Sequence, residues 1–268
     1  MFMLDEILLH KVQEVKKKKE LKGIEMIQEK VEKARKPRDF YNALTINGIS
    51  LIAEVKRKSP SKGELRKDFN AIDLARTYSK FGARAISVLA DETFFGGGAH
   101  VVEEVANDSE VTLPVMYKEF VIDPYQIFEA RSVGADAVLL IVRAIERSQL
   151  PHMISQVHKL GMQALVECFT AEEASIAVNA GARIIGVNNR DLQTFKVDLN
   201  RSEEIRSVLP NSIVTVSESG LNSRSDALEA EAMGFNGMLV GEALLKSEDI
   251  ATQVKEFSGF NDLAQNKL

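Results

Sequence analysis

The chain contains a single cysteine, Cys168, among 268 residues. No intrachain disulfide can form, and so little cysteine is typical of a reducing compartment. No stretch approaches the ~18 consecutive apolar residues of a membrane span. The first six residues include the acids Asp5 and Glu6 and lack the uninterrupted apolar stretch of a secretory signal. These absences predict a cytoplasmic protein that has no membrane partner.

An excess of basic charge is also missing, since the net charge is -5. A duplex-binding surface is therefore disfavoured, and we expect no nucleic-acid partner. The run Lys16–Lys19 is interpreted as a solvated helix face with acids nearby. Hydrophobic residues at 45% and charged residues at 27% are typical of a globular protein. A chain of this length buries roughly three quarters of its unfolded surface, so its core needs neither a disulfide nor a metal.

A glycine-led phrase recurs four times and sets the predicted fold. The four copies are Gly82–Leu89, Gly134–Ile141, Gly181–Asn188 and Gly234–Gly241. Each glycine suits the left-handed residue that ends a helix, and each apolar run that follows is typical of a strand buried on both faces. Four more strand candidates lie between the copies, at Ser50–Lys56, Leu113–Lys118, Gln163–Glu167 and Ile213–Ser217. Helix candidates alternate with them, at Ala71–Phe81, Pro124–Val133, Ser148–Leu160, Ala171–Ala180, Arg201–Leu209 and Ser223–Met233.

Eight strand–helix units spaced by about 20–35 residues predict parallel strands with crossover helices. Their number and total length are those of a (β/α)8 TIM barrel. The alternative is an open doubly wound sheet, which commonly has a Gly-x-Gly-x-x-Gly turn after its first strand, and that turn is absent. We therefore expect one α/β domain over residues 1–268, with the barrel at 49–258.

The first 48 residues precede the predicted barrel. Five apolar side chains fall at helical spacing in the first part of this segment: Leu4, Ile7, Leu8, Val12 and Val15. A second helical stretch covers Ile24–Ala34. We interpret residues 1–48 as an N-terminal helical extension that packs on the barrel. Residues 259–268 are expected to form a frayed tail.

Charged residues occur where the strands without the glycine phrase should end. They are Glu54, Lys56, Lys118, Glu167 and Glu218. The active site of a barrel lies at these carboxyl ends, and strand alternation directs Glu54 and Lys56 to the same side. A structural ion pair could explain any one of these charges, but several at one mouth predict a proton-transfer site. A lysine here could form a Schiff base or donate a proton, and nearby glutamates favour the protonated acid.

Three loops carry the residues expected at a phosphate site. Ser59–Gly63 follows the first strand, Ser219 and Gly220 follow the seventh, and Gly241 and Glu242 follow the eighth. In barrels the loops after strands seven and eight form a recurrent cradle of backbone N–H groups for phosphate. Glycine lets the backbone approach the ligand. The sequence thus predicts a phosphorylated small-molecule substrate.

The histidines, the cysteine and one aromatic, glycine-rich stretch give weaker indications of function. The four histidines lie away from the predicted strand ends, so we expect neither a zinc site nor a histidine base, and no metal. Cys168 is interpreted as a packed small residue rather than a nucleophile. The stretch Phe94–Gly98 after the second strand is either a flexible turn or a lid over an aromatic substrate.

From Leu4 to about Phe257 the sequence resembles the indole-3-glycerol phosphate synthase family. The stretches that carry the resemblance are Ile52–Ser61, Phe94–Gly97, Lys118–Phe120, Glu167, Ile185–Leu192 and Ser217–Leu221. The resemblance implies a lyase of tryptophan biosynthesis that uses no cofactor. The implied substrate is 1-(2-carboxyphenylamino)-1-deoxyribulose 5-phosphate, which undergoes ring closure with loss of carbon dioxide and water.

The resemblance also implies roles for individual residues. Lys118 matches the general acid, and Lys56 would bind the substrate carboxylate. Glu167 would act as acid and base when the hydroxyl leaves, with electrostatic support from Glu54. Positioning of the sugar hydroxyls and lysines is implied for Asn188, Glu218 and Arg190. Phosphate binding is implied for Ser59, Ser219, Gly220, Gly241 and Glu242. The apolar wall around the aryl ring would consist of Phe95, Phe120 and Leu192.

Three residues depart from the family pattern and leave details around the site and the lid open. Glu119 stands where aspartate is usual, Tyr117 where smaller or basic residues are common, and Ala90 where a hydroxyl residue is frequent. The alternatives are phosphoribosylanthranilate isomerase, a lysine aldolase and a catalytically silent phosphate-binding barrel. A monomer is one option for the oligomeric state.

Overall fold

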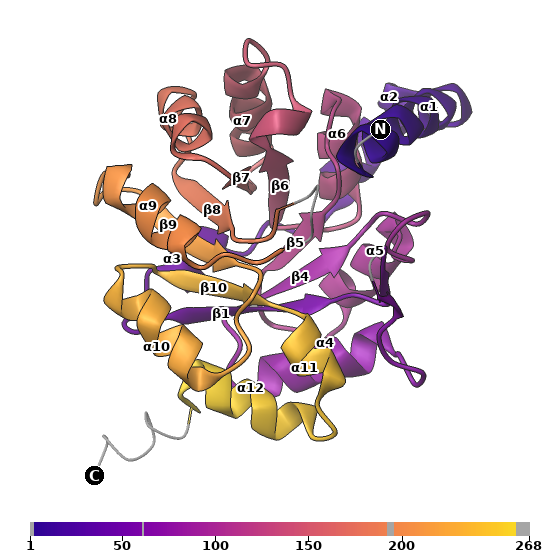
Figure 1. Ribbon diagram of the computed structural model, residues 1–268. Coiled ribbons are helices and arrows are strands. Elements are labelled where there is room, and N and C mark those ends of the chain that lie inside the picture. Colours follow the sequence, from indigo (N-terminus) through magenta and orange to yellow (C-terminus); the bar gives the residue numbers. More distant parts are fainter. Residues whose placement is uncertain (1–2, 61, 192–195, 261–268) are drawn as a thin grey trace.

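The computed structural model describes residues 3–60, 62–191 and 196–260. Eight parallel strands form a closed barrel in the order β1-β10-β9-β8-β7-β6-β5-β4, which confirms the predicted (β/α)8 TIM barrel (Figure 1). The strands are β1 (Ser50–Val55), β4 (Ala85–Leu89), β5 (Val115–Lys118), β6 (Ala137–Ile141), β7 (Gln163–Cys168), β8 (Ile184–Asn188), β9 (Val214–Glu218) and β10 (Gly237–Val240). Pairing of β1 with both β10 and β4 closes the barrel.

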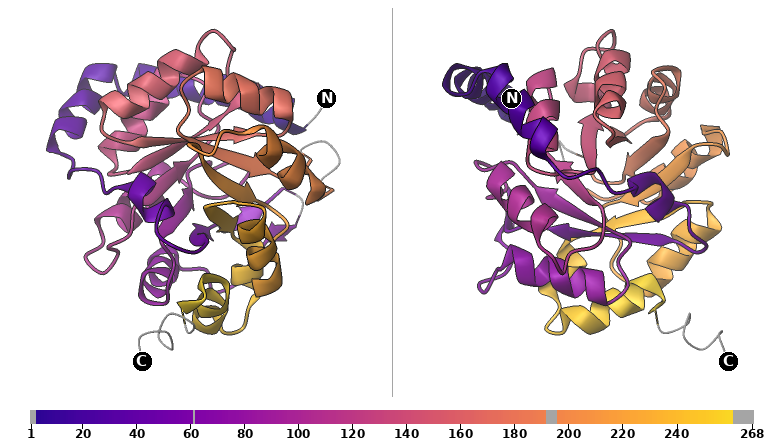
Figure 2. Two further views of the ribbon diagram at one scale, coloured as in Figure 1. Left: turned by 90° about the vertical axis from the view of Figure 1, so that its left-hand side faces the viewer. Right: turned by 180° about the vertical axis from the view of Figure 1, so that it is seen from behind.

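Helices surround the strands on the outside of the barrel (Figures 1 and 2). They are α4 (Ala71–Lys80), α5 (Ala99–Asn107), α6 (Pro124–Ser132), α7 (Leu150–Lys159), α8 (Ala171–Asn179), α9 (Asn200–Val208), α10 (Arg224–Ala232) and α12 (Ile250–Ser258). Shorter elements are the hairpin strands β2 (Lys58–Ser59) and β3 (Gly63–Glu64), the 3-10 turn η1 (Val142–Ala144) and the helix α11 (Glu242–Lys246). Of the helices, α5, α11 and α12 have no counterpart among the predicted ones. No helix within the described residues is long and apolar enough to cross a membrane.

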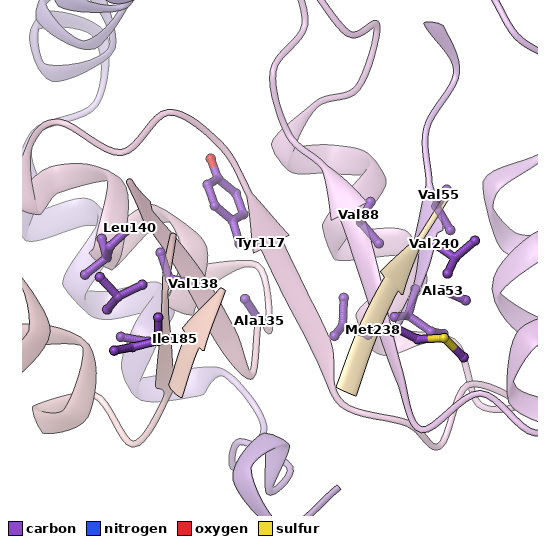
Figure 3. Packing of buried hydrophobic residues seen from close by; sticks show 14 of the residues in the cluster. Ala53, Val55, Val88, Tyr117, Ala135, Val138, Leu140, Ile185, Met238 and Val240 are labelled. Carbon is purple, nitrogen blue, oxygen red and sulfur yellow. The ribbon is translucent and has the colours of Figure 1, made fainter. Parts of the chain in front are cut away.

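Strand alternation divides the buried side chains into two layers. Val55, Val88 and Val240 face the surrounding helices, and Figure 3 shows them within that outer layer. Ile52 belongs to the inner layer, and Glu54, two residues further along β1, lies on the same face as Ile52. The same step leads from Leu165 to Glu167 on β7. The barrel interior is thus apolar in the part before the carboxyl ends of the strands and charged at those ends.

The extension consists of α1 (Met3–Leu21), α2 (Ile24–Lys33) and α3 (Phe40–Leu44). Figures 1 and 2 show α1 and α2 beside α6, where Val15, Ile27 and Tyr125 form a small apolar cluster. The predicted apolar face of α1 needs one correction. Val12 is 51% exposed, whereas Lys11 is fully buried, because three carboxylates, described below, surround the lysine ammonium.

The link between α2 and α3 is fastened to the barrel by one carboxylate. Asp136, fully buried just before β6, accepts two hydrogen bonds from the guanidinium of Arg35, at 2.7 and 2.8 Å. Its oxygens also accept from the backbone N–H groups of Arg38 and Val115, at 2.6 and 2.8 Å. The assignment of residues 1–268 to one domain stays a prediction, and residues 261–268 of the predicted tail lie outside the described residues.

We expect the substitution Asp136→Ala to lower the free energy of unfolding by about 3–5 kcal/mol, because the half-buried guanidinium of Arg35 and two backbone N–H groups lose their partner. Urea denaturation followed by circular dichroism measures the change. Glu110→Ala serves as the control, since Glu110 is 65% exposed in its pair with Arg76 and should change stability by less than about 1 kcal/mol. Equal effects of the two substitutions would contradict the anchoring role of Asp136.

Candidate active site

A cavity of about 400 Å³ opens at the carboxyl end of the strands, a volume within the usual range for small-molecule sites. We call it the mouth cavity. Its walls include thirteen of the predicted site residues: Glu54, Lys56, Ser59, Phe95, Lys118, Phe120, Glu167, Asn188, Arg190, Ser219, Gly220, Gly241 and Glu242. Glu218 is buried and reaches the cavity through its ion pair with Lys118. Leu192 lies outside the described residues.

Lys118 on β5 lies close to two carboxylates, which come from β1 and β9, two strands separated only by β10. Its Nζ atom is 3.0 Å from Oε1 of Glu54 and 3.5 Å from Oε2 of Glu218. Burial disfavours the ammonium, but the charges of Glu54, Glu218 and Glu167 outweigh burial and raise the pKa of Lys118. Lys118 therefore carries its proton at neutral pH and can donate it.

The carboxylate of Glu54 joins the two lysines. Its Oε2 atom accepts a hydrogen bond from Lys56, while Oε1 faces Lys118. Burial would raise the pKa of Glu54, but the two ammonium groups overcome this effect and lower it to about 2. Glu54 is consequently a permanent anion that fixes both lysines at the cavity wall.

Glu167 and Glu218 behave differently from Glu54. Burial raises the pKa of Glu167 well above its usual value, and the neighbouring charge of Glu218 adds to the shift. Burial likewise raises the pKa of Glu218, although Lys118 opposes the rise. Asn188 contributes a hydrogen bond to Glu167. A raised pKa favours the protonated carboxylic acid, and this form can donate a proton in acid catalysis.

Two glycines make room for these carboxylates. A Cβ atom on Gly186 of β8 would overlap with Oε1 of Glu218, and one on Gly241, just after β10, would overlap with Oε2 of Glu54. Gly241 is one of the predicted phosphate-loop residues, so the structure adds a second reason for glycine there. Gly186 was not a candidate site residue, since a glycine within a strand says nothing of what approaches it.

The loops after β1, β9 and β10 add backbone groups and a second group of charged side chains to the cavity. Ser219 has a φ of 68° and Gly220 a φ of 87°; such strain in a non-glycine residue is frequent at functional sites. Lys62 and Lys246 form ion pairs with Glu242. Burial would raise the pKa of Glu242, but these two lysines lower it to about 2. Lys62 lies in the predicted phosphate loop Ser59–Gly63, although the sequence assigns no role to its own side chain.

Aromatic and aliphatic side chains form the remaining wall. The ring centroids of Phe95 and Phe120 lie 6.0 Å apart, and both residues line the cavity. The first turns of α1 add Met3, Leu4 and Ile7. Helical spacing identified Leu4 and Ile7 as buried, but it did not show that they face the cavity. Within residues 3–60, 62–191 and 196–260, no three His, Cys, Asp or Glu side chains are grouped so as to hold a metal ion.

Solved structures of other proteins share the fold. A 3-hexulose-6-phosphate synthase from Salmonella typhimurium superimposes with a TM-score of 0.65 at 14% identity, covering 79% of this chain and 97% of that one. A thiamine phosphate pyrophosphorylase from Pyrococcus furiosus gives a TM-score of 0.61 at 18% identity, covering 80% and 96%. At these identities the similarity concerns the barrel alone.

Sequence comparison is more specific. The family model described as indole-3-glycerol phosphate synthase matches residues 4–257. Proteins named indole-3-glycerol phosphate synthase are 45% identical in Dehalococcoides mccartyi strain CBDB1, over 82% of this chain and 85% of the relative, and 44% identical in Roseiflexus castenholzii, over 96% and 98%. The barrel, the mouth cavity and these matches agree, and the chain belongs to the indole-3-glycerol phosphate synthase family.

Proposed function

We propose that the chain converts 1-(2-carboxyphenylamino)-1-deoxyribulose 5-phosphate into indole-3-glycerol phosphate, carbon dioxide and water in tryptophan biosynthesis. The family membership supports the reaction. The observation that carries the mechanism is the Lys118 ammonium, held between Glu54 and Glu218 inside a cavity that has an aromatic wall and a cationic, glycine-rich wall. These walls suit the aryl ring and the phosphate.

Ring closure begins at the substrate ketone. The aryl carbon that bears the carboxylate attacks the ketone carbon, and Lys118 protonates the ketone oxygen as the new carbon–carbon bond forms. Lys56 holds the substrate carboxylate. Loss of carbon dioxide returns the electron pair of the broken bond to the ring and restores its aromaticity, and the apolar wall of Phe95 and Phe120 disfavours the charged carboxylate at this point.

Dehydration completes the indole. Glu167, whose pKa is raised by burial, donates a proton to the hydroxyl group, which leaves as water. The adjacent CH2 carbon loses a proton to the neutral amine of Lys118, and this transfer regenerates the ammonium. Glu167 recovers its proton from solvent, so the cycle consumes one proton overall, as decarboxylation of a carboxylate requires. Asn188, Glu218 and Arg190 position the sugar hydroxyls and Lys118.

The phosphate lies, in this proposal, against Ser59 and the backbone at Ser219, Gly220, Gly241 and Glu242. All five residues line the mouth cavity. Leu192 remains a proposed part of the aryl wall. The active species is proposed to be a cytoplasmic monomer that needs no cofactor, and the single cysteine is consistent with that compartment.

We expect the purified protein to generate indole fluorescence when mixed with the carboxyphenylamino-deoxyribulose phosphate. Absence of product from folded protein would contradict the proposal.

Borohydride added with substrate should leave the protein mass unchanged, because a protonated Lys118 does not form the Schiff base of an aldolase. Phosphoribosylanthranilate isomerase activity is not expected, since it needs a reactive cysteine, and Cys168 is buried in the outer apolar layer with a raised pKa.

A further inference from the structure

Lys11 is a fully buried lysine on α1, in the N-terminal extension. Its Nζ atom lies 2.8 Å from Glu14, 3.0 Å from Asp91 and 2.9 Å from Glu119. Asp91 follows β4 and Glu119 follows β5, so a single ammonium group joins α1 to the ends of two barrel strands. Burial of a lysine is costly without partners, and here all three ammonium protons have a carboxylate acceptor.

The same two carboxylates also hold the backbone of the aromatic wall. The second oxygen of Asp91 accepts hydrogen bonds from the N–H groups of Phe94 and Phe95, at 2.6 and 2.9 Å. The second oxygen of Glu119 accepts from the N–H group of Phe120, at 2.7 Å. In each carboxylate, one oxygen therefore accepts a hydrogen bond from Lys11. The other oxygen accepts a hydrogen bond from the backbone N–H group of a phenylalanine that lines the mouth cavity.

We propose that Lys11 is a positioning residue for the aryl ring of the substrate: it fixes Asp91 and Glu119, and through them the spacing of Phe95 and Phe120. The proposal rests on the function proposed above, since it assigns the ring to this wall. Without Lys11, Asp91 and Glu119 would face each other as two buried anions. One of them would have to turn toward water or take up a proton, and the hydrogen bonds to the phenylalanine N–H groups would change with it.

A simple anchoring role for Lys11 is the rival explanation, and Lys18 provides the matched control. Lys18 also lies on α1, pairs with Glu14 at 3.1 Å, and ties the helix to Glu129 of α6 at 3.1 Å. Those contacts do not involve Asp91 or Glu119. Loss of Lys18 thus weakens the attachment of α1 but leaves the carboxylates behind Phe95 and Phe120 in place.

The experiment compares Lys11→Met with Lys18→Met in the full-length protein. Two competitors are titrated calorimetrically: the substrate with its ketone reduced to an alcohol, which keeps the ring, and ribulose 5-phosphate, which lacks it. We expect Lys11→Met to weaken binding of the ring-containing competitor and to raise KM by about 10–100-fold, since displacement of positioning groups by about 1 Å has effects of this size. Binding of ribulose 5-phosphate should change less than about twofold, and kcat should fall less than KM rises. Lys18→Met should leave both competitors unaffected.

Equal weakening of the two competitors by Lys11→Met would overturn the proposal, as would the same ring-specific loss in Lys18→Met. If Lys11→Met does not fold, Lys11→Arg is used instead, because arginine retains the charge but changes the donor geometry. A smaller loss of affinity confined to the ring-containing competitor would support the proposal. Unchanged affinity for that competitor, or equal weakening of both, would contradict it. Failure of the wild-type protein to turn over substrate would instead contradict the proposed function, because competitor binding is measured without turnover.

Discussion

Replacing Lys118 with alanine is expected to lower kcat by about 10²–10⁴-fold, the range typical of a lost general acid. The ketone oxygen would then have to develop negative charge in a cavity that already contains Glu54, Glu167 and Glu218. The fold should persist, because Glu54 keeps its partner Lys56 and Glu218 can take up a proton at its raised pKa. Steady-state fluorescence kinetics and circular dichroism measure the two effects.

Lys118→Arg separates charge from proton donation. Arginine preserves a cation near Glu54 but hardly releases its proton, so this variant should remain stable and lose nearly as much activity as the alanine variant. Lys67→Ala, which alters an exposed lysine outside the mouth cavity, should retain full activity. Wild-type turnover in Lys118→Arg would show that a cation alone suffices and would exclude the acid role.

Glu167→Gln is expected to slow the formation of indole by about 10²–10³-fold while carbon dioxide is still released. Glutamine keeps the size of the side chain but cannot donate the proton that the departing hydroxyl needs. Ring closure and decarboxylation depend on Lys118, so rapid-quench measurements should find carbon dioxide appearing before indole. Simultaneous appearance of both products would contradict this division of labour.

The pH dependence of kcat tests the same residue. Glu167 acts in its protonated form, and burial raises its pKa; the wild-type rate should therefore fall as the pH rises through that raised value. In Glu167→Gln the remaining slow rate should not decline over the same range. Glu172→Gln, an exposed substitution at the start of α8, should keep the wild-type profile. If kcat of Glu167→Gln fell at alkaline pH as it does in the wild-type protein, the titration of another group would be its cause.

The barrel and most of the strand-end charges could be predicted because local sequence determines them. Each glycine phrase combines a helix end with a buried strand, and alternation alone places Glu54 above Ile52 and Glu167 above Leu165. The four strands predicted between the glycine phrases start and end within two residues of the observed ones, and each of the other four begins three residues after the glycine of its phrase. Periodicity is informative here since each strand has one face toward the interior.

Features that depend on which surfaces meet could not be predicted. The spacing of apolar residues on α1 included Val12, which is exposed, and passed over Lys11, which is buried. Hydrophobic periodicity treats a lysine as solvated, and only the carboxylates of two distant strand ends reverse that expectation. The loops of Lys62 and Glu242 are predicted to meet at the phosphate site, but the ion pair between these two residues, 180 positions apart, is not predicted by any local pattern.

The glycines opposite Glu54 and Glu218 bear on how this chemistry could be moved to another protein. At each position a single methyl group would displace a carboxylate that contacts Lys118. Grafting the lysine and its two glutamates onto a different eight-stranded barrel would therefore fail wherever the recipient has a side chain at the places of Gly186 and Gly241. A graft would have to transfer five positions together: Lys118, Glu54, Glu218 and Gly186 on four strands, and Gly241 in the loop after β10. The two glycines contribute by having no side chain, which leaves room for the carboxylates.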